Sequence, residues 1–125
     1  MTRSLIAIAL LLSGVPVLAH HSFDAEYDAN KVTTISGFVT KVDWQNPHAF
    51  VYVDVTDQAG AVKSYRVEMG PPYALVRGGW KKDTIRVGDK VTVEGAALAK
   101  DGSNSAGSLP TTMMVLSTGQ KLVMR

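Results

Sequence analysis

The sequence of 125 residues contains no cysteine. This absence excludes disulfide bonds, a catalytic thiolate and a membrane anchor attached through a lipidated cysteine. Without disulfides the hydrophobic core alone has to stabilise the fold, which a domain of about 100 residues can do. The chain is therefore expected to form one ordinary globular domain.

The chain also lacks a strong excess of either charge sign. It carries 13 basic and 11 acidic residues, and Arg3 is the one charged residue among positions 1–19, so residues 20–125 carry 12 basic and 11 acidic residues. Binding to DNA or RNA depends on a concentrated positive charge that attracts phosphates. The composition therefore gives no electrostatic reason to expect a nucleic-acid partner.

Long apolar runs are confined to the start of the chain. Arg3 provides a positive n-region, residues 5–12 form an unbroken apolar h-region, and Val17 and Ala19 fit the small-residue rule for signal peptidase. An uncut membrane anchor is the alternative, but it needs about 20 apolar residues, and here the run is shorter and is followed by Ser, Gly and Pro. The pattern predicts a signal peptide over residues 1–19. With no membrane-spanning run after it, the mature protein is expected in the periplasm of a Gram-negative source.

The remaining residues read as a short polar leader followed by a β-rich domain. Residues 20–31 are expected to form a strap laid across the domain, and residues 32–125 the domain itself. Period-two alternation and β-branched residues predict five strands. The expected strands are residues 32–44 with a bend at Gly37, residues 48–55, residues 61–69, a fourth that carries Val91 and Val93, and residues 111–117, before a last short run at 121–125.

One short helix is expected within residues 70–80, where prolines suit the first turn and glycines the C-terminal end. The order of three strands, a short helix and two strands predicts an all-β protein of the OB-fold type, a five-stranded Greek-key barrel. A small β-sandwich is the alternative that the same strands allow. On the OB prediction, strands two and three form the ligand face, flanked by loops at residues 44–47 and 99–110.

Several stretches resemble a known family. They are HHSFDAEYD at the mature start, WQNPHAFVYVDV, and GPPYALVRGGWKKDTIRVGDKVTVEG followed by AKDGSN. In these stretches the chain is similar to a family of small exported bacterial proteins that is catalogued as a domain of unknown function. The resemblance covers essentially the whole mature chain and implies export and a small β-barrel, but it implies no activity or ligand.

The three histidines are the strongest candidates for a functional site. If cleavage follows Ala19, His20 begins the mature chain, so its α-amino group and its imidazole Nδ1 can chelate one metal ion. A second imidazole in trans would complete a T-shaped site of three nitrogens, which resembles the histidine brace of exported copper proteins. Nitrogen-rich tetragonal ligation is what Cu(II) prefers, so copper is the expected metal.

Two residues are candidates for the trans position. His21 is adjacent and would form a site in the tail, whereas His48 lies at the start of the second strand and would tie the site to the fold. Further donors for such a site are oxygens of Asp24, Glu26 and Tyr27 and sulfurs of Met113 and Met114. The alternative is structural: the first two histidines simply begin a polar segment, and His48 hydrogen-bonds a loop carbonyl.

A second hypothesis is a metal-free module that binds a small ligand or a protein partner on the strand-two face. Phe50 and Tyr52, with Arg66 and Trp44, would provide a stacking surface there. Glu68 and Asp54 are a carboxylate pair in principle, but carboxylates on polar strand faces usually only face water. No nucleophile elbow, phosphate loop or dinucleotide motif is present, so no catalytic constellation is recognised.

Overall fold

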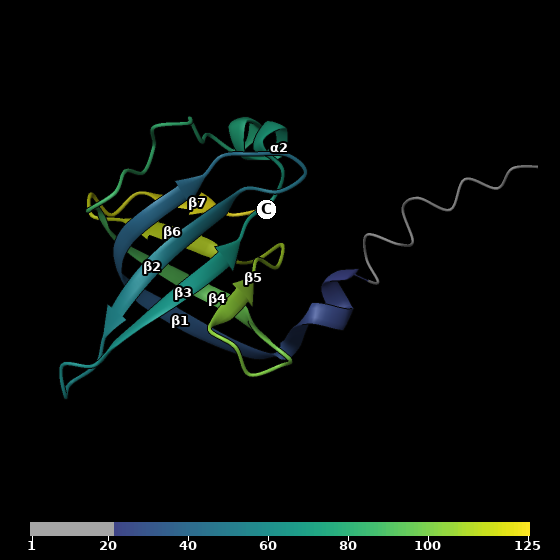
Figure 1. Ribbon diagram of the computed structural model, residues 1–125. Coiled ribbons are helices and arrows are strands. Elements are labelled where there is room, and N and C mark those ends of the chain that lie inside the picture. Colours follow the sequence, from purple (N-terminus) through teal and green to yellow (C-terminus); the bar gives the residue numbers. More distant parts are fainter. Residues whose placement is uncertain (1–21) are drawn as a thin grey trace, which may run out of the picture.

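The computed structural model describes residues 22–125, which are mostly β-structure (Figure 1). The strands are β1 Tyr27–Asp43, β2 Phe50–Thr56, β3 Val62–Glu68, β4 Lys90–Ala99, β5 Ser105–Gly107, β6 Met113–Leu116 and β7 Lys121–Val123, and the helix α2 spans Pro72–Arg77. Residues 22–26 form a helical turn directly before β1. Within this part of the chain, no helix is long and apolar enough to cross a membrane.

Five of the strands form a closed ring. The sheet order is β1-β2-β3-β5-β4-β6-β7, and an additional antiparallel pairing between β1 and β4 joins the ends of the first five. All pairings in this sheet are antiparallel except that of β3 with β5. The mostly β class and a short helix after β3 are confirmed, and this helix, α2, lies at one end of the ring (Figure 1). The helical turn at residues 22–26 was not expected.

The core lies inside this ring and follows the predicted alternation. Val51 and Val53 of β2 and Val67 of β3 are fully buried, and Val55 is packed against the same cluster from a partly buried position. On the opposite face of the hairpin, paired residues such as Phe50 and Glu68 project outward together. The valine pattern therefore correctly separated the inner and outer faces of β2 and β3.

Strand β1 is longer at its start than the sequence indicated. It begins at Tyr27 and not at residue 32, because Tyr27 and Asp28 already pair with the end of β4 before the register shifts between Asp28 and Val32. Part of the expected strap at residues 20–31 is therefore strand. The register shifts of β1 near Gly37 lie between Thr33 and Ile35 and between Val39 and Lys41, on either side of this glycine. A Cβ on Gly37 would lie 1.9 Å from the backbone oxygen of Asp54, so this glycine permits close approach of β1 and β2.

The segment at residues 100–110, expected as a flexible loop, contains the short strand β5. Its Ala106 is fully buried, and its Gly107 pairs with Glu68 in parallel and with Ala97 in antiparallel orientation. The five expected strands and the last short run are present, and β5 is an addition. It closes the ring between β3 and β4 and brings residues after it against the end of β3.

Candidate functional site

The predicted site residues fall into three groups. His20 and His21 lie outside the described residues. His48 follows the 44–47 loop and stands two residues before β2. The residues proposed for the ligand face, Phe50, Tyr52, Arg66 and Trp44, lie on or beside the β2–β3 hairpin.

Backbone pairing beyond the end of the hairpin places His48 beside Glu68. Phe50 pairs with Glu68, and the next residue, Ala49, exchanges hydrogen bonds with Met69 and Gly70: the Met69 N–H donates to the Ala49 oxygen at 2.8 Å, and the Ala49 N–H donates to the Gly70 oxygen at 3.1 Å. Side chains alternate along a strand, so His48 projects to the same outer face as Phe50 and Glu68. The ring and the carboxylate therefore meet on the outside of the sheet.

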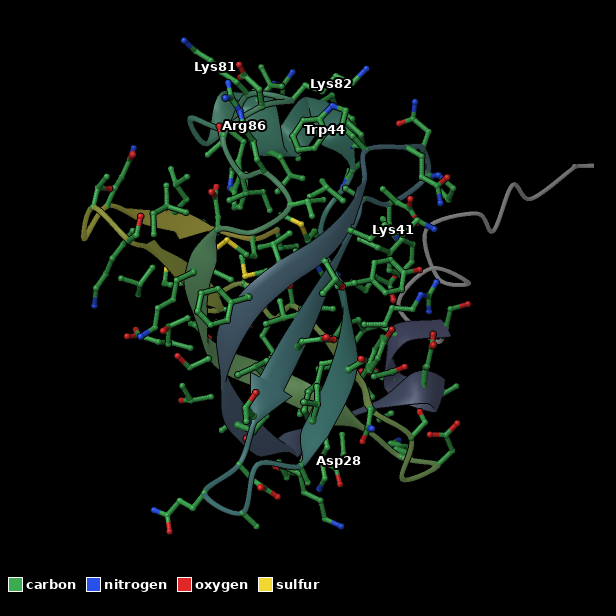
Figure 2. The ribbon with its side chains drawn as sticks, turned by 60° about the vertical axis from the view of Figure 1, so that its left-hand side comes forward. Asp28, Lys41, Trp44, Lys81, Lys82 and Arg86 are labelled. Carbon is green, nitrogen blue, oxygen red and sulfur yellow. The ribbon has the colours of Figure 1, made fainter. Side chains whose placement is uncertain are left out.

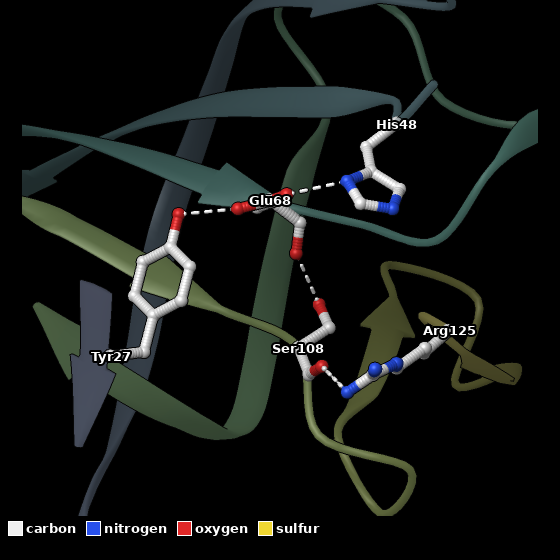
Figure 3. Close-up of polar contacts among 5 residues, drawn as sticks. All are labelled: Tyr27, His48, Glu68, Ser108 and Arg125. Atoms are coloured by element: carbon white, nitrogen blue, oxygen red, sulfur yellow. Dashed lines mark hydrogen bonds and ion pairs between the residues drawn. The ribbon is translucent and has the colours of Figure 1, made fainter. Parts of the chain in front are cut away.

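Glu68 links His48 to Tyr27 through two short hydrogen bonds (Figure 3). The Tyr27 hydroxyl donates to Glu68 Oε2 at 2.6 Å, and His48 Nδ1 lies 2.6 Å from Glu68 Oε1. A carboxylate only accepts hydrogen bonds, so Nδ1 carries the proton in this contact. In the neutral imidazole this leaves the lone pair on the other ring nitrogen, Nε2, which points away from Glu68 in Figure 3.

Burial differs along this chain of three residues. Tyr27 is 2% exposed, the Glu68 side chain is 17% exposed and the His48 side chain is 45% exposed. Tyr27 is buried outside the core cluster, in a separate contact on the outer face of the sheet. Nδ1 of His48 is therefore held from the protein side, while the His48 side chain as a whole is about half exposed.

The pKa of Tyr27 is raised above its ordinary value. Burial is the largest cause, followed by the hydrogen bond to Glu68 and the negative charge of that carboxylate. Both interactions favour the neutral phenol over the phenolate. Tyr27 therefore remains a hydrogen-bond donor to Glu68 at any ordinary pH.

His48 and Ser22 line the same pocket, with a volume of about 100 Å³. Its wall consists of Ser22, Phe23, Glu26, His48, Glu68, Met69, Gly70, Pro71, Ser108 and Arg125. Ser22 is the first described residue and lies two positions after His20. The start of the described chain and the residue that follows the 44–47 loop, His48, therefore lie in the wall of the same pocket.

Aromatic packing seats residues 22–26 beside the sheet. The rings of Phe23 and Tyr27 lie 4.9 Å apart between centroids, and both rest on Gly107, where a Cβ would lie 2.7 and 2.6 Å from their carbon atoms. The backbone N–H of Lys100 also donates to the oxygen of Glu26 at 2.9 Å, and the Lys100 ammonium donates to the backbone oxygen of Asp24. These contacts fix the approach of the chain to the pocket.

Residues 22–125 contain no cluster of three histidine, aspartate or glutamate side chains that could hold a metal ion by itself. Of the further donors predicted, Tyr27 is used in the hydrogen bond to Glu68, and Glu26 lines the pocket. Met113 and Met114 do not line it, and Met114 is fully buried in the core. Within the described residues, His48 is therefore not part of a three-residue metal-binding cluster.

The proposed ligand face is partly covered by its own cations. The Arg66 guanidinium lies 3.7 Å from the Phe50 ring centroid, and the Lys41 ammonium lies 5.2 Å from that of Tyr52. Trp44 is partly buried against the core cluster, so it does not extend this face. Figure 2 shows Trp44 at the end of the molecule that carries α2, together with Lys81, Lys82 and Arg86.

Sequence reasoning missed three residues of the site. Glu68 was expected to face water, but it joins His48 and Tyr27. Ser108 donates its backbone N–H and its hydroxyl to the Glu68 backbone oxygen at 3.0 and 2.6 Å, and Arg125 closes the wall beside it. The sequence did contain a signal for Glu68: the period-two pattern places it on the outer face of β3, opposite the start of β2 that follows His48. No local pattern marked Ser108 or Arg125.

A family model matches residues 9–108, and its description is "Family of unknown function (DUF6152)". Since the match covers most of the chain, the chain belongs to this family. No curated protein and no solved structure gives a match.

Proposed function

We propose that the protein is an exported copper-binding protein that acts in metal handling. The description of the family assigns no activity, so the proposal rests on the geometry of the pocket. The copper ion would be held by the α-amino group and Nδ1 of His20, after signal-peptide removal, and by Nε2 of His48. The main support is that Ser22, two residues after His20, lines the same pocket as His48.

The orientation of His48 supports this proposal. A histidine that binds metal usually donates its other ring N–H to a carboxylate or carbonyl, which fixes the tautomer and makes the ligating nitrogen more basic. His48 has this arrangement through Glu68, and Tyr27 in turn holds Glu68. A loop histidine that only satisfied a backbone carbonyl would not need a partly buried carboxylate behind it.

The reach of the chain is adequate. Two residues of extended backbone span at most about 7 Å, so His20 can approach a pocket that Ser22 already lines. The length of chain between His20 and the pocket is therefore sufficient for His20 to reach His48. The amine, the Nδ1 of His20 and the Nε2 of His48 would give three nitrogens, the donor set for which Cu(II) leads the divalent ions.

The experiment compares four mature proteins titrated with Cu(II) in competition with a chelator of known affinity. They are the protein beginning at His20, the same protein with one extra alanine in front, His48→Ala and His21→Ala. The proposal expects the alanine extension and His48→Ala each to weaken binding at least about 100-fold, more than the 10- to 100-fold typical of a lost outer partner. His21→Ala is the matched control and should bind nearly as well as the parent.

Two outcomes contradict the proposal. Equal affinity with and without the extra alanine would exclude the terminal amine as a ligand. A loss with the extension and with His21→Ala, but not with His48→Ala, would place the copper in the tail alone. Mass spectrometry of the secreted protein provides a separate check, because any first residue other than His20 removes the amine donor.

We further propose that the five-strand ring is an OB-type barrel, on the support of its long β1, its β2–β3 hairpin and α2 between β3 and β4. On this proposal, β2 and β3 form the ligand face next to the pocket. The second candidate function, a metal-free ligand or protein-binding module, is supported by Phe50, Tyr52 and Arg66 on that face. A flat ligand there would have to displace Arg66 from Phe50. Replacing Phe50 and Tyr52 with alanine should then abolish partner binding without changing copper affinity.

A further inference from the structure

Arg125 provides the positive charge in the wall of the pocket. Glu26 and Glu68 are the carboxylates that line it, and Glu68 already accepts a hydrogen bond at each of its oxygens. Within residues 22–125, three lysine or arginine side chains lie within 4.0 Å of a carboxylate, and Arg125 is not one of them. The guanidinium therefore lines the pocket without a carboxylate partner in the described chain.

The backbone of Arg125 is packed against Gly70, although the residue as a whole is exposed. Gly70 donates its N–H to the Met124 oxygen at 2.8 Å, and a Cβ on Gly70 would lie 2.9 Å from the Arg125 Cα, so the two backbones are in close contact. The guanidinium carbon lies 5.0 Å from the centroid of the Phe23 ring. One terminal nitrogen, Nη1, lies 3.5 Å from the Ser108 oxygen (Figure 3). The guanidinium thus lies beside an aromatic ring and a carbonyl.

Such a guanidinium suits an anion. Its planar fork of N–H groups matches the two oxygens of a carboxylate, and stacking on a ring reduces the freedom lost when that contact forms. A pocket of about 100 Å³ has room for a ligand of a few heavy atoms. His48 lines the same pocket, and its Nδ1 is already engaged by Glu68.

We infer that the pocket binds a small carboxylate anion through Arg125, next to the copper ion held by His48. The second half of this inference rests on the proposed function. Three nitrogen donors would leave room for a further ligand on Cu(II), and an anion held by Arg125 would supply a carboxylate oxygen there. The anion subsite itself depends only on Arg125, Phe23 and Ser108, so it can be tested without copper.

The first experiment uses acetate as the probe and the copper-free mature protein beginning at His20. Amide signals of Phe23 and Ser108 are followed by NMR as sodium acetate replaces sodium chloride at constant ionic strength. We expect saturable shifts with a Kd on the order of millimolar, as for a single ion contact in a half-open pocket. Arg125→Gln should weaken acetate binding about tenfold or more, since a hydrogen bond to a charged group is lost.

Two variants keep this experiment decisive. Arg77→Gln is the matched control, because Arg77 also lies over an aromatic ring, 5.6 Å from the Tyr73 centroid, but on α2 and not in the pocket. It should bind acetate like the parent. Arg125→Lys preserves the charge without the fork and should give an intermediate loss. Equal acetate affinity in the parent and in Arg125→Gln, with both folded by circular dichroism, would overturn the anion subsite.

The second experiment repeats the acetate titration with Cu(II) added and follows the copper signal by electron paramagnetic resonance. Acetate should change the copper spectrum in the parent and in Arg77→Gln, at concentrations about tenfold lower than in Arg125→Gln. If copper does not bind at all, the proposed function fails, and the copper-free titration still decides about Arg125. If copper binds but acetate leaves its spectrum unchanged, the anion does not reach the metal and this inference fails alone.

Discussion

Replacing Glu68 with glutamine tests the link between the fold and the candidate copper site. Glutamine has the same shape and still accepts a hydrogen bond from His48 Nδ1, so the packing is preserved and the negative charge is lost. Hydrogen bonds to charged groups contribute about 1.5–3 kcal/mol and neutral ones about 1 kcal/mol, so each of the two 2.6 Å contacts loses about 1 kcal/mol. The half-exposed His48 contact is screened by solvent and loses less.

We therefore expect Glu68→Gln to lower the free energy of unfolding by about 1–2 kcal/mol. Copper affinity should fall 10- to 100-fold, the usual effect of removing a partner that orients a metal-binding histidine. Urea unfolding of the copper-free protein measures the first quantity, and chelator competition measures the second. The two measurements together separate a folding effect from a site effect.

The matched control is Glu94→Gln, the same change at an exposed ion pair. Glu94 lies 3.6 Å from the Lys121 ammonium, and both side chains are about half exposed. This variant should change the free energy of unfolding by less than about 0.5 kcal/mol and leave copper affinity unaltered. Parent-like copper affinity in Glu68→Gln would refute the reasoning that Glu68 prepares His48 for metal.

Three further predictions concern the surroundings of the site. Gly107→Ala should destabilise the protein by about 1–3 kcal/mol and weaken copper binding, because the added Cβ would clash with the rings of Phe23 and Tyr27. Gly78→Ala is the control for the urea-unfolding and copper-competition measurements, because its Cβ would meet nothing closer than 3.4 Å. Above about pH 10 the parent should lose stability as the pH rises, because the pKa of Tyr27 is raised in the folded protein and only the unfolded chain releases the proton of this residue. Tyr27→Phe should reduce this loss by up to about 1.4 kcal/mol per pH unit. Urea unfolding at pH 9 and pH 11 measures the effect, and an equal change in the free energy of unfolding between the two pH values in both proteins would contradict it. Trp80→Phe should cost about 2–3 kcal/mol in thermal unfolding without affecting copper, since its buried indole N–H donates to the backbone oxygen of Val123 in β7 and Trp80 is not part of the pocket wall; a change in copper affinity beyond twofold would argue against that separation.

The β2–β3 hairpin was predictable because its signal is local. Alternating valines require one buried face, and the turn residues between the strands fix the register. Strand β5 had no such signal: Ser105, Ala106 and Gly107 have low β-propensity and become a strand because β3 and β4 already stand on either side. The early start of β1 has the same cause, since Tyr27 gains its partner from β4, about seventy residues further along the chain.

The candidate site divides in the same way. His48 was identified from its residue type and its place at the mouth of the hairpin. Glu68 was not, because a carboxylate on the polar face of a strand usually faces water, and only the contact with Tyr27 and His48 distinguishes it. Arg125 reaches the pocket through the pairing of Gly70 with Met124, a contact across more than fifty residues that no local pattern encodes.

On the proposed function, export and metal binding are coupled by covalent chemistry. Before signal-peptide cleavage the nitrogen of His20 is an amide, which does not bind copper as a free amine does, and only cleavage after Ala19 creates the amine. The pocket with His48 and Glu68 would then fold as an incomplete metal site, which lacks the amine ligand until cleavage exposes His20. A version of the protein that retains residues before His20 should therefore fold with unchanged stability but bind copper as poorly as the alanine-extended form. If the extended protein instead bound copper like the mature one, His48 with its Glu68 partner would have to recruit its other nitrogens from elsewhere, and the coupling to export would be lost.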